Sequence, residues 1–302
     1  MLEFHFWSGK NLPKLDLKLN KKVVVYTENR LKIDHHSFHE KGNPYHSIEE
    51  FAFTETGYFI DEFQRIFISH FGKKKGYRKI VRSLAKHPYG LFRKQISEET
   101  GVDLGGGLTD YLTDLESAGF ISSSTPFHKN KNSRLLKYRL SDPYMRFYFS
   151  FIEPNLNRIK STSSSSHFAQ LAQKSTFNAW MGIAFENLCI EHAIKISEIL
   201  GFSGIEYSFG PYFSAPGKES GVQIDLLFDR NDKVITLCEM KYTLASVGTA
   251  VIQDVERKVN ILQSKFKQKT IQKILISLSP PTKDLTATGY FFKVIHPESF
   301  LK

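Results

Sequence analysis

The sequence predicts an α/β (α+β) protein in which a small helical domain with a β-hairpin precedes a second domain that combines a longer β-hairpin with helices. Apolar residues recur at helical spacing within residues 77–117, and two short strand-like runs follow them. A longer apolar hairpin at residues 221–242 lies between two helical stretches. A chain of 302 residues has room for two or three domains. We place the domains at residues 1–71, 72–142 and 176–302, with a connector at 143–175 that contains the serine-rich run at 161–166.

Composition excludes several classes of protein. Hydrophobic residues make up 41% of the chain and aromatic residues 14%, which is typical of ordered globular domains. Cys189 and Cys238 are too few for a disulfide framework or a cysteine-rich metal site. No apolar stretch approaches the length of a membrane span, and the N-terminus lacks the features of a signal peptide. We therefore expect a cytoplasmic protein with no membrane partner.

The positive charge is concentrated in the middle of the chain. The net charge is +10, and residues 72–160 hold 17 Lys and Arg against 8 Asp and Glu. Charge that served only solubility would be spread more evenly along the sequence. The middle segment is therefore expected to meet a polyanion, and DNA is the first candidate.

The middle segment has the element order of a winged helix. Helices are expected at Tyr77–Lys86, at Phe92–Thr100 and after the Gly105–Gly107 turn, and strands at Phe120–Ser123 and Leu135–Leu140. Three helices followed by a hairpin form a helix-turn-helix variant, whose third helix often reads DNA.

The third helix is too acidic for that role, because its polar positions include Asp110, Asp114 and Glu116. The positive charge lies before the first helix and on the loop between the strands. Two interpretations stay open: contact with the DNA backbone, or a mainly structural or protein-binding role. The residues proposed for nucleic-acid contact are Lys73, Lys74, Lys75, Arg78, Lys79, Lys129, Lys131 and Arg134.

The hairpin Gly221–Tyr242 carries the most informative charges. Alternation along strands puts Asp225 on one face of the first strand, and Glu239 and Lys241 on one face of the second. A register that brings these faces together groups three ionisable residues, which is costly in an apolar setting unless they coordinate something. Two carboxylates on one face can hold Mg²⁺ or Mn²⁺. The lysine can orient or deprotonate an attacking water, or stabilise the charge that develops on a phosphate. The alternative is a surface hairpin with a Glu239–Lys241 salt bridge.

Two neighbouring helices offer further candidates. A helix predicted over Phe177–Leu200 places Glu186 within its apolar part. A stripe formed by Ile252, Val255, Val259, Leu262 and Phe266 predicts a helix after the hairpin. Gln253 lies beside that stripe.

Glu186, Asp225 and the Glu239-x-Lys241 pair resemble the PD-(D/E)xK nuclease superfamily, whose core is a mixed sheet flanked by helices. Ile224 stands where that motif has proline. The resemblance implies that Asp225, Glu239 and Glu186 are metal ligands or orient them. It also implies that Lys241 is catalytic and that the helix after the hairpin lends Gln253.

Residues 57–302 also resemble the C-terminal half of archaeal-type ATPases, which carry a winged helix and a nuclease-like domain of unknown function. The resemblance rests on GYFIDEFQRIF, YRLSDPYMRFYFSFIEPN, WMGIAFENLC and the hairpin. Such ATPases carry a GxxxxGK[ST] loop, which is absent here, so we expect no ATP site in this chain. The chain would be a truncated relative or a stand-alone descendant, and residues 1–71 would include a remnant of the ATPase lid.

Two functions follow. The leading hypothesis is a Mg²⁺-dependent DNA phosphodiesterase, or endonuclease, with a winged-helix module for DNA. The alternative is a non-catalytic DNA- or protein-binding regulatory module that keeps the nuclease fold and works with an ATPase or as a homo-oligomer.

The cluster of His35, His36, His39 and His46 is interpreted as an exposed loop, and the aromatic run at 144–151 as packing between domains.

Overall fold

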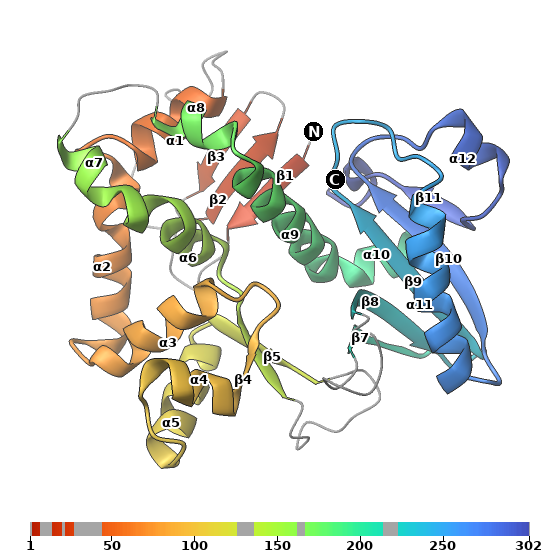
Figure 1. Ribbon diagram of the computed structural model, residues 1–302, viewed down its shortest axis with the longest axis horizontal. Helices are drawn as coiled ribbons and strands as arrows, with labels where there is room; N and C mark the ends of the chain where they lie inside the picture. Colours follow the sequence, from red (N-terminus) through yellow and green to blue (C-terminus); the bar gives the residue numbers. More distant parts are fainter. Residues whose placement is uncertain are drawn as a thin grey trace. The chain divides into compact units, whose positions relative to one another are not determined.

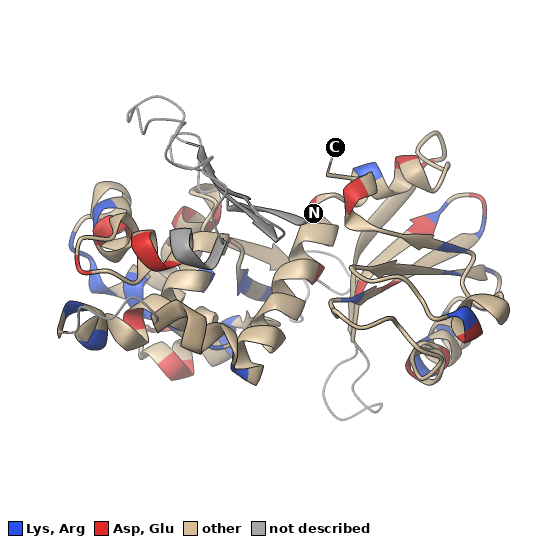
Figure 2. Cartoon of the chain, turned by 90° about the horizontal axis from the view of Figure 1, so that it is seen from above, with Lys and Arg blue, Asp and Glu red and all other residues tan. Residues whose placement is uncertain are grey.

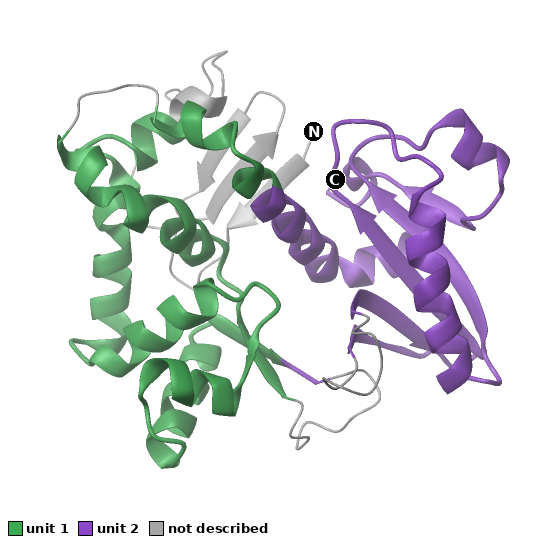
Figure 3. Cartoon of the chain, viewed as in Figure 1, with its two compact units in different colours: residues 1, 3–123, 136–178 green, residues 2, 124–135, 179–302 purple. Residues whose placement is uncertain are grey.

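The computed structural model describes residues 2–6, 14–19, 22–26, 44–125, 136–161, 167–213 and 223–301, with side chains from Ile48 onward. The chain forms two compact units (Figure 3). The first holds residues 1, 3–123 and 136–178, and the second holds residues 2, 124–135 and 179–302. The division falls within helix α9 (Ser175–Glu191).

The first unit begins with a small sheet and two helices. Its strands follow the order β1-β2-β3, with β2 and β3 antiparallel. The elements are β1 (Leu2–Phe6), β2 (Lys14–Leu19), β3 (Lys22–Tyr26), α1 (Pro44–Ala52) and α2 (Tyr58–Phe71). Of the predicted histidine loop, His35, His36 and His39 lie outside the described residues, and His46 is described only by its backbone.

The next elements have the order predicted for a winged helix, and a short strand is added between the first two helices. They are α3 (Lys75–Ala85), β4 (Leu91–Phe92), α4 (Arg93–Thr100), α5 (Gly106–Ser117), β5 (Ile121–Ser124) and β6 (Lys137–Leu140). The sheet order is β4-β6-β5. Gly101 ends α4 with a φ of 67°, a conformation that residues with a side chain rarely adopt. The predicted wing loop, with Lys129, Lys131 and Arg134, lies outside the described residues.

The predicted aromatic run is buried inside the first unit. It forms α6 (Pro143–Phe147) and the π-helix η1 (Tyr148–Ile152). The Tyr148 ring stacks on Phe63 of α2 at 4.6 Å between centroids, and the Tyr144 hydroxyl donates to the Phe59 carbonyl at 2.9 Å. The aromatic run therefore packs against α2, which places residues 143–152 and α2 in one core. The rest of this unit is η2 (Glu153–Asn155), α7 (Leu156–Ser161) and α8 (His167–Ala172).

The second unit is built on a five-stranded sheet (Figure 1), and the expectation of a mixed sheet is confirmed. The strand order is β11-β10-β9-β8-β7; β7, β8 and β9 are antiparallel neighbours, whereas β9, β10 and β11 run parallel. The strands are β7 (Tyr207–Phe213), β8 (Gln223–Arg230), β9 (Val234–Lys241), β10 (Thr270–Ser277) and β11 (Lys293–Ile295). Helix α11 (Val251–Lys265) links β9 to β10, and α12 (Lys283–Ala287) precedes β11.

Helix α11 packs on one face of this sheet. Val251, Val255, Val259 and Leu262 join a buried cluster with Leu227 of β8, Leu237 of β9 and Leu275 of β10. The apolar stripe predicted for this helix is confirmed, with Ile252 and Phe266 partly buried against the cluster. Face-to-face packing of this helix places its inner side chains directly over β8 and β9.

The helix predicted over residues 177–200 was wrong in its continuity. It forms two helices, α9 and α10 (Ala193–Ile199), that are separated at His192. The backbone of His192 has φ −96° and ψ 19°, outside the helical values, and this change interrupts the helical ladder. The aromatic ring of Phe202, after α10, lies 5.2 Å from that of Phe228 on β8.

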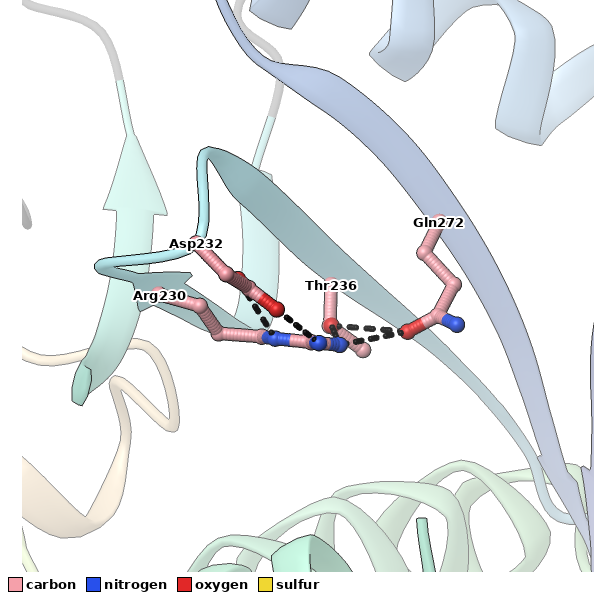
Figure 4. Close-up of polar contacts among 4 residues, drawn as sticks. All are labelled: Arg230, Asp232, Thr236 and Gln272. Carbon is pink, nitrogen blue, oxygen red and sulfur yellow. Dashed lines mark hydrogen bonds and ion pairs between the residues drawn. The ribbon is translucent and has the colours of Figure 1, made fainter. Parts of the chain in front are cut away.

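The β8–β9 turn is tied down by a polar network (Figure 4). Arg230 Nε donates to Asp232 Oδ1 at 3.1 Å, and Arg230 Nη1 donates to Gln272 Oε1 of β10 at 3.1 Å. The Arg230 guanidinium also lies over the Phe202 ring, 4.5 Å from its centroid. Thr236, fully buried, donates to the same Gln272 oxygen at 3.1 Å. This network fixes the turn end of the hairpin, and the predicted site lies at the other end.

Among the described helices, none has the length and apolarity needed to cross a lipid bilayer.

Candidate active site on the C-terminal sheet

The hairpin register brings the predicted charges together. Leu226 pairs with Cys238 and Leu227 with Leu237 in the antiparallel β8–β9 ladder. Continued by one residue, this register sets Asp225 opposite Glu239. Opposite residues of an antiparallel pair point to the same face with Cβ atoms about 4.5–5.5 Å apart. Two carboxylates therefore occupy one face at the open end of the hairpin.

Glu239 is buried, and its carboxylate forms ion pairs with two lysines. Only 4% of the residue is exposed. Lys241 Nζ lies 3.0 Å from Glu239 Oε1, and Lys258 Nζ lies 2.6 Å from Glu239 Oε2. The predicted Glu239–Lys241 salt bridge is therefore present, but on a buried carboxylate. Each oxygen of Glu239 has its own cation, which offsets the cost of burying the charge.

Asp225 on β8 and Glu186 on α9 both lie close enough to the buried Cys189 thiol to raise its pKa. Asp225 is half-buried, and its Oδ1 accepts a hydrogen bond from Gln223 Nε2 at 2.8 Å. Burial raises the pKa of the Cys189 thiol well above its usual value, and the charges of Cys238, Glu186 and Asp225 raise it further. Both carboxylates therefore act on one buried thiol of α9, one turn along from the half-buried Glu186.

Helix α11 contributes a lysine that the sequence reasoning missed. Gln253, the predicted contributor, is exposed, whereas Lys258 has a side chain only 15% exposed and reaches Glu239. Lys258 lies next to the buried Val259, at the edge of the apolar stripe. A lysine at the edge of such a stripe was the available signal, although alone it does not name a partner.

A second charged group lies beside the site on the same side of the sheet. Tyr290 donates to Glu256 of α11, and Lys273 of β10 lies over the Tyr290 ring at 3.9 Å from its centroid. Burial raises the pKa of Tyr290, and the hydrogen bond to Glu256 and the charges of Glu256 and Glu239 raise it further. Tyr290 therefore stays a neutral donor at physiological pH.

The donor set has the chemistry of a hard-cation site. Asp225 and Glu239 would offer a cation oxygen ligands, which Mg²⁺ and Mn²⁺ prefer, and Mg²⁺ commonly keeps waters in its other positions. Within the described part of the chain, no three His, Cys, Asp or Glu side chains gather closely enough to hold a metal ion. The fit is therefore that of a two-carboxylate site, and Glu239 already has its charge balanced by lysines.

The basic residues of the first unit divide into two groups. Lys73, Lys74 and Lys75 are exposed at the start of α3. Arg78, in contrast, lies over the Phe63 ring and 3.6 Å from Glu153, and Lys79 donates to the Thr100 carbonyl at 3.2 Å. Lys and Arg occur at several separate places on this unit (Figure 2). Part of the predicted basic surface is thus engaged in internal contacts.

A family model matches residues of both units. Residues 148–274 match the model of DUF234, a family described as archaea bacterial proteins of unknown function. That range includes Glu186, Asp225, Glu239, Lys241 and Lys258.

Two individual proteins are also similar. An uncharacterized protein of Methanocaldococcus jannaschii, MJECL04, is 26% identical over 169 residues, which make up 55% of this chain and 35% of the relative. The chain thus spans about a third of that relative's length. A chain in the structure of an EndoMS–dsDNA2 complex is 19% identical, with a TM-score of 0.23 over 34% of this chain and 43% of that chain.

Proposed function

We propose that this chain is a Mg²⁺- or Mn²⁺-dependent DNA phosphodiesterase of the PD-(D/E)xK type. The observation that carries the proposal is Glu239, which is 4% exposed, ion-paired to Lys241 and set opposite Asp225 by the hairpin register. A structural hairpin gains little from burying such a group, because burial of ions usually costs more than their attraction returns.

Each residue has a role that its position supports. Asp225 and Glu239 would hold the cation, and Glu186 would orient a ligand or a water from α9. A divalent ion bound there supplies Lewis acidity toward the phosphodiester and lowers the pKa of an attacking water. Lys241, whose side chain is 35% exposed, can reach solvent and orient that water or stabilise charge on the phosphate.

The first unit would deliver DNA. Lys73, Lys74 and Lys75 are exposed at the start of α3, where they can contact the phosphate backbone. The exposed polar positions of α5 include the acidic Asp110, Asp114 and Glu116, so we propose backbone contact without base-specific reading. The resemblance to archaeal-type ATPases leads us to propose an ATPase partner as well.

A plasmid-nicking assay with Mg²⁺ or Mn²⁺ tests the activity. We expect nicking by the wild type, and loss in Glu239→Ala and Lys241→Ala. Lys269→Ala is the matched control, because Lys269 pairs with Asp229 at the other end of β8. Equal nicking by all four proteins would contradict the proposal.

One observation favours a second function. Both oxygens of Glu239 are already held by lysines, which is also what a scaffold without catalysis would need to bury that carboxylate. The alternative is a regulatory module that binds DNA or protein and keeps the nuclease fold. This alternative predicts that the protein binds DNA but that no divalent ion binds through Asp225.

A further inference from the structure

We propose that Lys258 is an internal counter-ion that competes with the divalent ion for Glu239. The inference rests on the proposed function, because it concerns the same carboxylate. Lys258 Nζ lies 2.6 Å from Glu239 Oε2, the shorter of the two ammonium contacts. A divalent ion that uses Oε2 must therefore displace Lys258 first.

Burial makes the Lys258 contact the stronger of the two. The side chain of Lys258 is 15% exposed and that of Lys241 is 35% exposed, while Glu239 is buried at 4%. Opposite charges attract more strongly where water is excluded, so Lys258 neutralises Glu239 more effectively than Lys241 does. Lys241 remains accessible for chemistry, and Lys258 governs access of the cation.

The position of Lys258 permits the exchange. Val255 and Val259 of α11 are buried in the core cluster, so the backbone on both sides of Lys258 is held in place. The flexible four-carbon side chain can swing away without moving the helix. The ammonium and the divalent ion then bind Glu239 in mutually exclusive states, which lowers the affinity for the ion by the cost of breaking the ion pair.

Calorimetric titration of the full chain with Mn²⁺ measures this competition. We expect Lys258→Met to bind Mn²⁺ on the order of tenfold more tightly than the wild type. Lys258→Arg keeps the charge and is expected to bind like the wild type. Lys269→Met removes a comparable ion pair, with Asp229 on the same strand face as Asp225, and is expected to leave the affinity unchanged. Structural damage would weaken binding, so a gain of affinity is specific to competition.

A second variant guards against misfolding. Lys258→Gln keeps a hydrogen-bond donor toward Glu239 without the charge, and we expect the same direction of change. The Mn²⁺-induced rise in melting temperature should also be larger in both neutral variants than in the wild type, because tighter binding to the folded state stabilises it more.

The outcomes separate this inference from the proposed function. Equal or weaker Mn²⁺ binding by Lys258→Met and Lys258→Gln, with Asp225-dependent binding in the wild type, would overturn only the role of Lys258. If neither the wild type nor the neutral variants bind Mn²⁺ in an Asp225-dependent manner, the proposed function fails with it. Tighter binding that Asp225→Ala abolishes in the Lys258→Met background supports both.

Discussion

Two glutamates, one in each unit, are buried to the same extent but are held in different ways. Glu49 in the first unit and Glu239 in the second are each 4% exposed. The Glu49 carboxylate accepts hydrogen bonds from the backbone N–H groups of His167 and Phe168, both at 2.6 Å. The Glu239 carboxylate faces the ammonium groups of Lys241 and Lys258 instead.

The difference lies in what the partners can do. Backbone N–H groups at the start of α8 are fixed by the chain, so Glu49 serves as a cap and has no freedom to exchange partners. Lysine side chains can move away, so Glu239 can accept another cation. Burial alone therefore does not distinguish a structural carboxylate from a chemical one, whereas the nature of its partners does.

The largest effect is expected at Glu239. Glu239→Gln removes a ligand of the cation, and we expect divalent-dependent DNA cleavage to fall by about a thousandfold, because several kcal/mol of transition-state stabilisation is lost. Single-turnover cleavage of a labelled duplex measures it. Glu256→Gln, on the neighbouring helix, is the control. If the Glu239→Gln protein cleaves like the wild type, Glu239 has no more part in cleavage than Glu49 has, and the comparison fails.

The second effect separates Glu49 from catalysis. Glu49→Ala leaves two N–H groups without their carboxylate, and we expect the amides of residues 167–172 to lose about 2 kcal/mol of protection. Hydrogen exchange followed by mass spectrometry measures this, and cleavage per folded molecule should not change. Unchanged exchange at α8 would mean that the cap contributes nothing to local stability.

The third effect concerns DNA binding by the first unit. Replacing Lys73, Lys74 and Lys75 together with Gln should reduce the slope of log affinity against log salt by about 3, since each phosphate contact contributes about 0.9. Fluorescence anisotropy from low to moderate salt measures it. Arg78→Gln should leave the slope unchanged, because Arg78 is engaged with Glu153 and the Phe63 ring. A weak salt dependence in the wild type would argue against backbone contact.

The smallest effect is a pH dependence in the first unit. Burial raises the pKa of Glu62 above its usual 4.5, although Arg65, at 3.2 Å, and Tyr58 oppose the shift. The charged form is thus disfavoured in the folded state. The stability that protonated Glu62 contributes is therefore lost as the pH rises from below 4.5 through the raised pKa. Glu62→Gln should remove this pH dependence, which amounts to less than about 1 kcal/mol in the free energy of unfolding. Urea unfolding at pH 4 and pH 7 compares the two proteins, and a parallel pH profile would contradict this assignment.

The sequence predicted best where the period of an element decides the outcome. Alternation along β8 and β9 placed Asp225 and Glu239 on one face, and the helical stripe of α11 was confirmed. Contacts between distant segments were missed because they depend on how elements cross. Lys258 reaches Glu239 only because α11 lies over β9, and Arg78 is occupied by Glu153, which follows much later in the chain. Short strands such as β4, and the break at His192, leave almost no periodic signal.

Mn²⁺ titration of the wild type, Glu49→Ala and Asp225→Ala tests the central claim most directly. If Asp225 and Glu239, on the five-stranded sheet of the second unit, form an exchangeable cation site, the wild type and Glu49→Ala bind the ion with similar affinity, and Asp225→Ala loses binding. Equal binding by all three proteins, or no binding by the wild type, would contradict the assignment of Asp225 and Glu239 as a metal site.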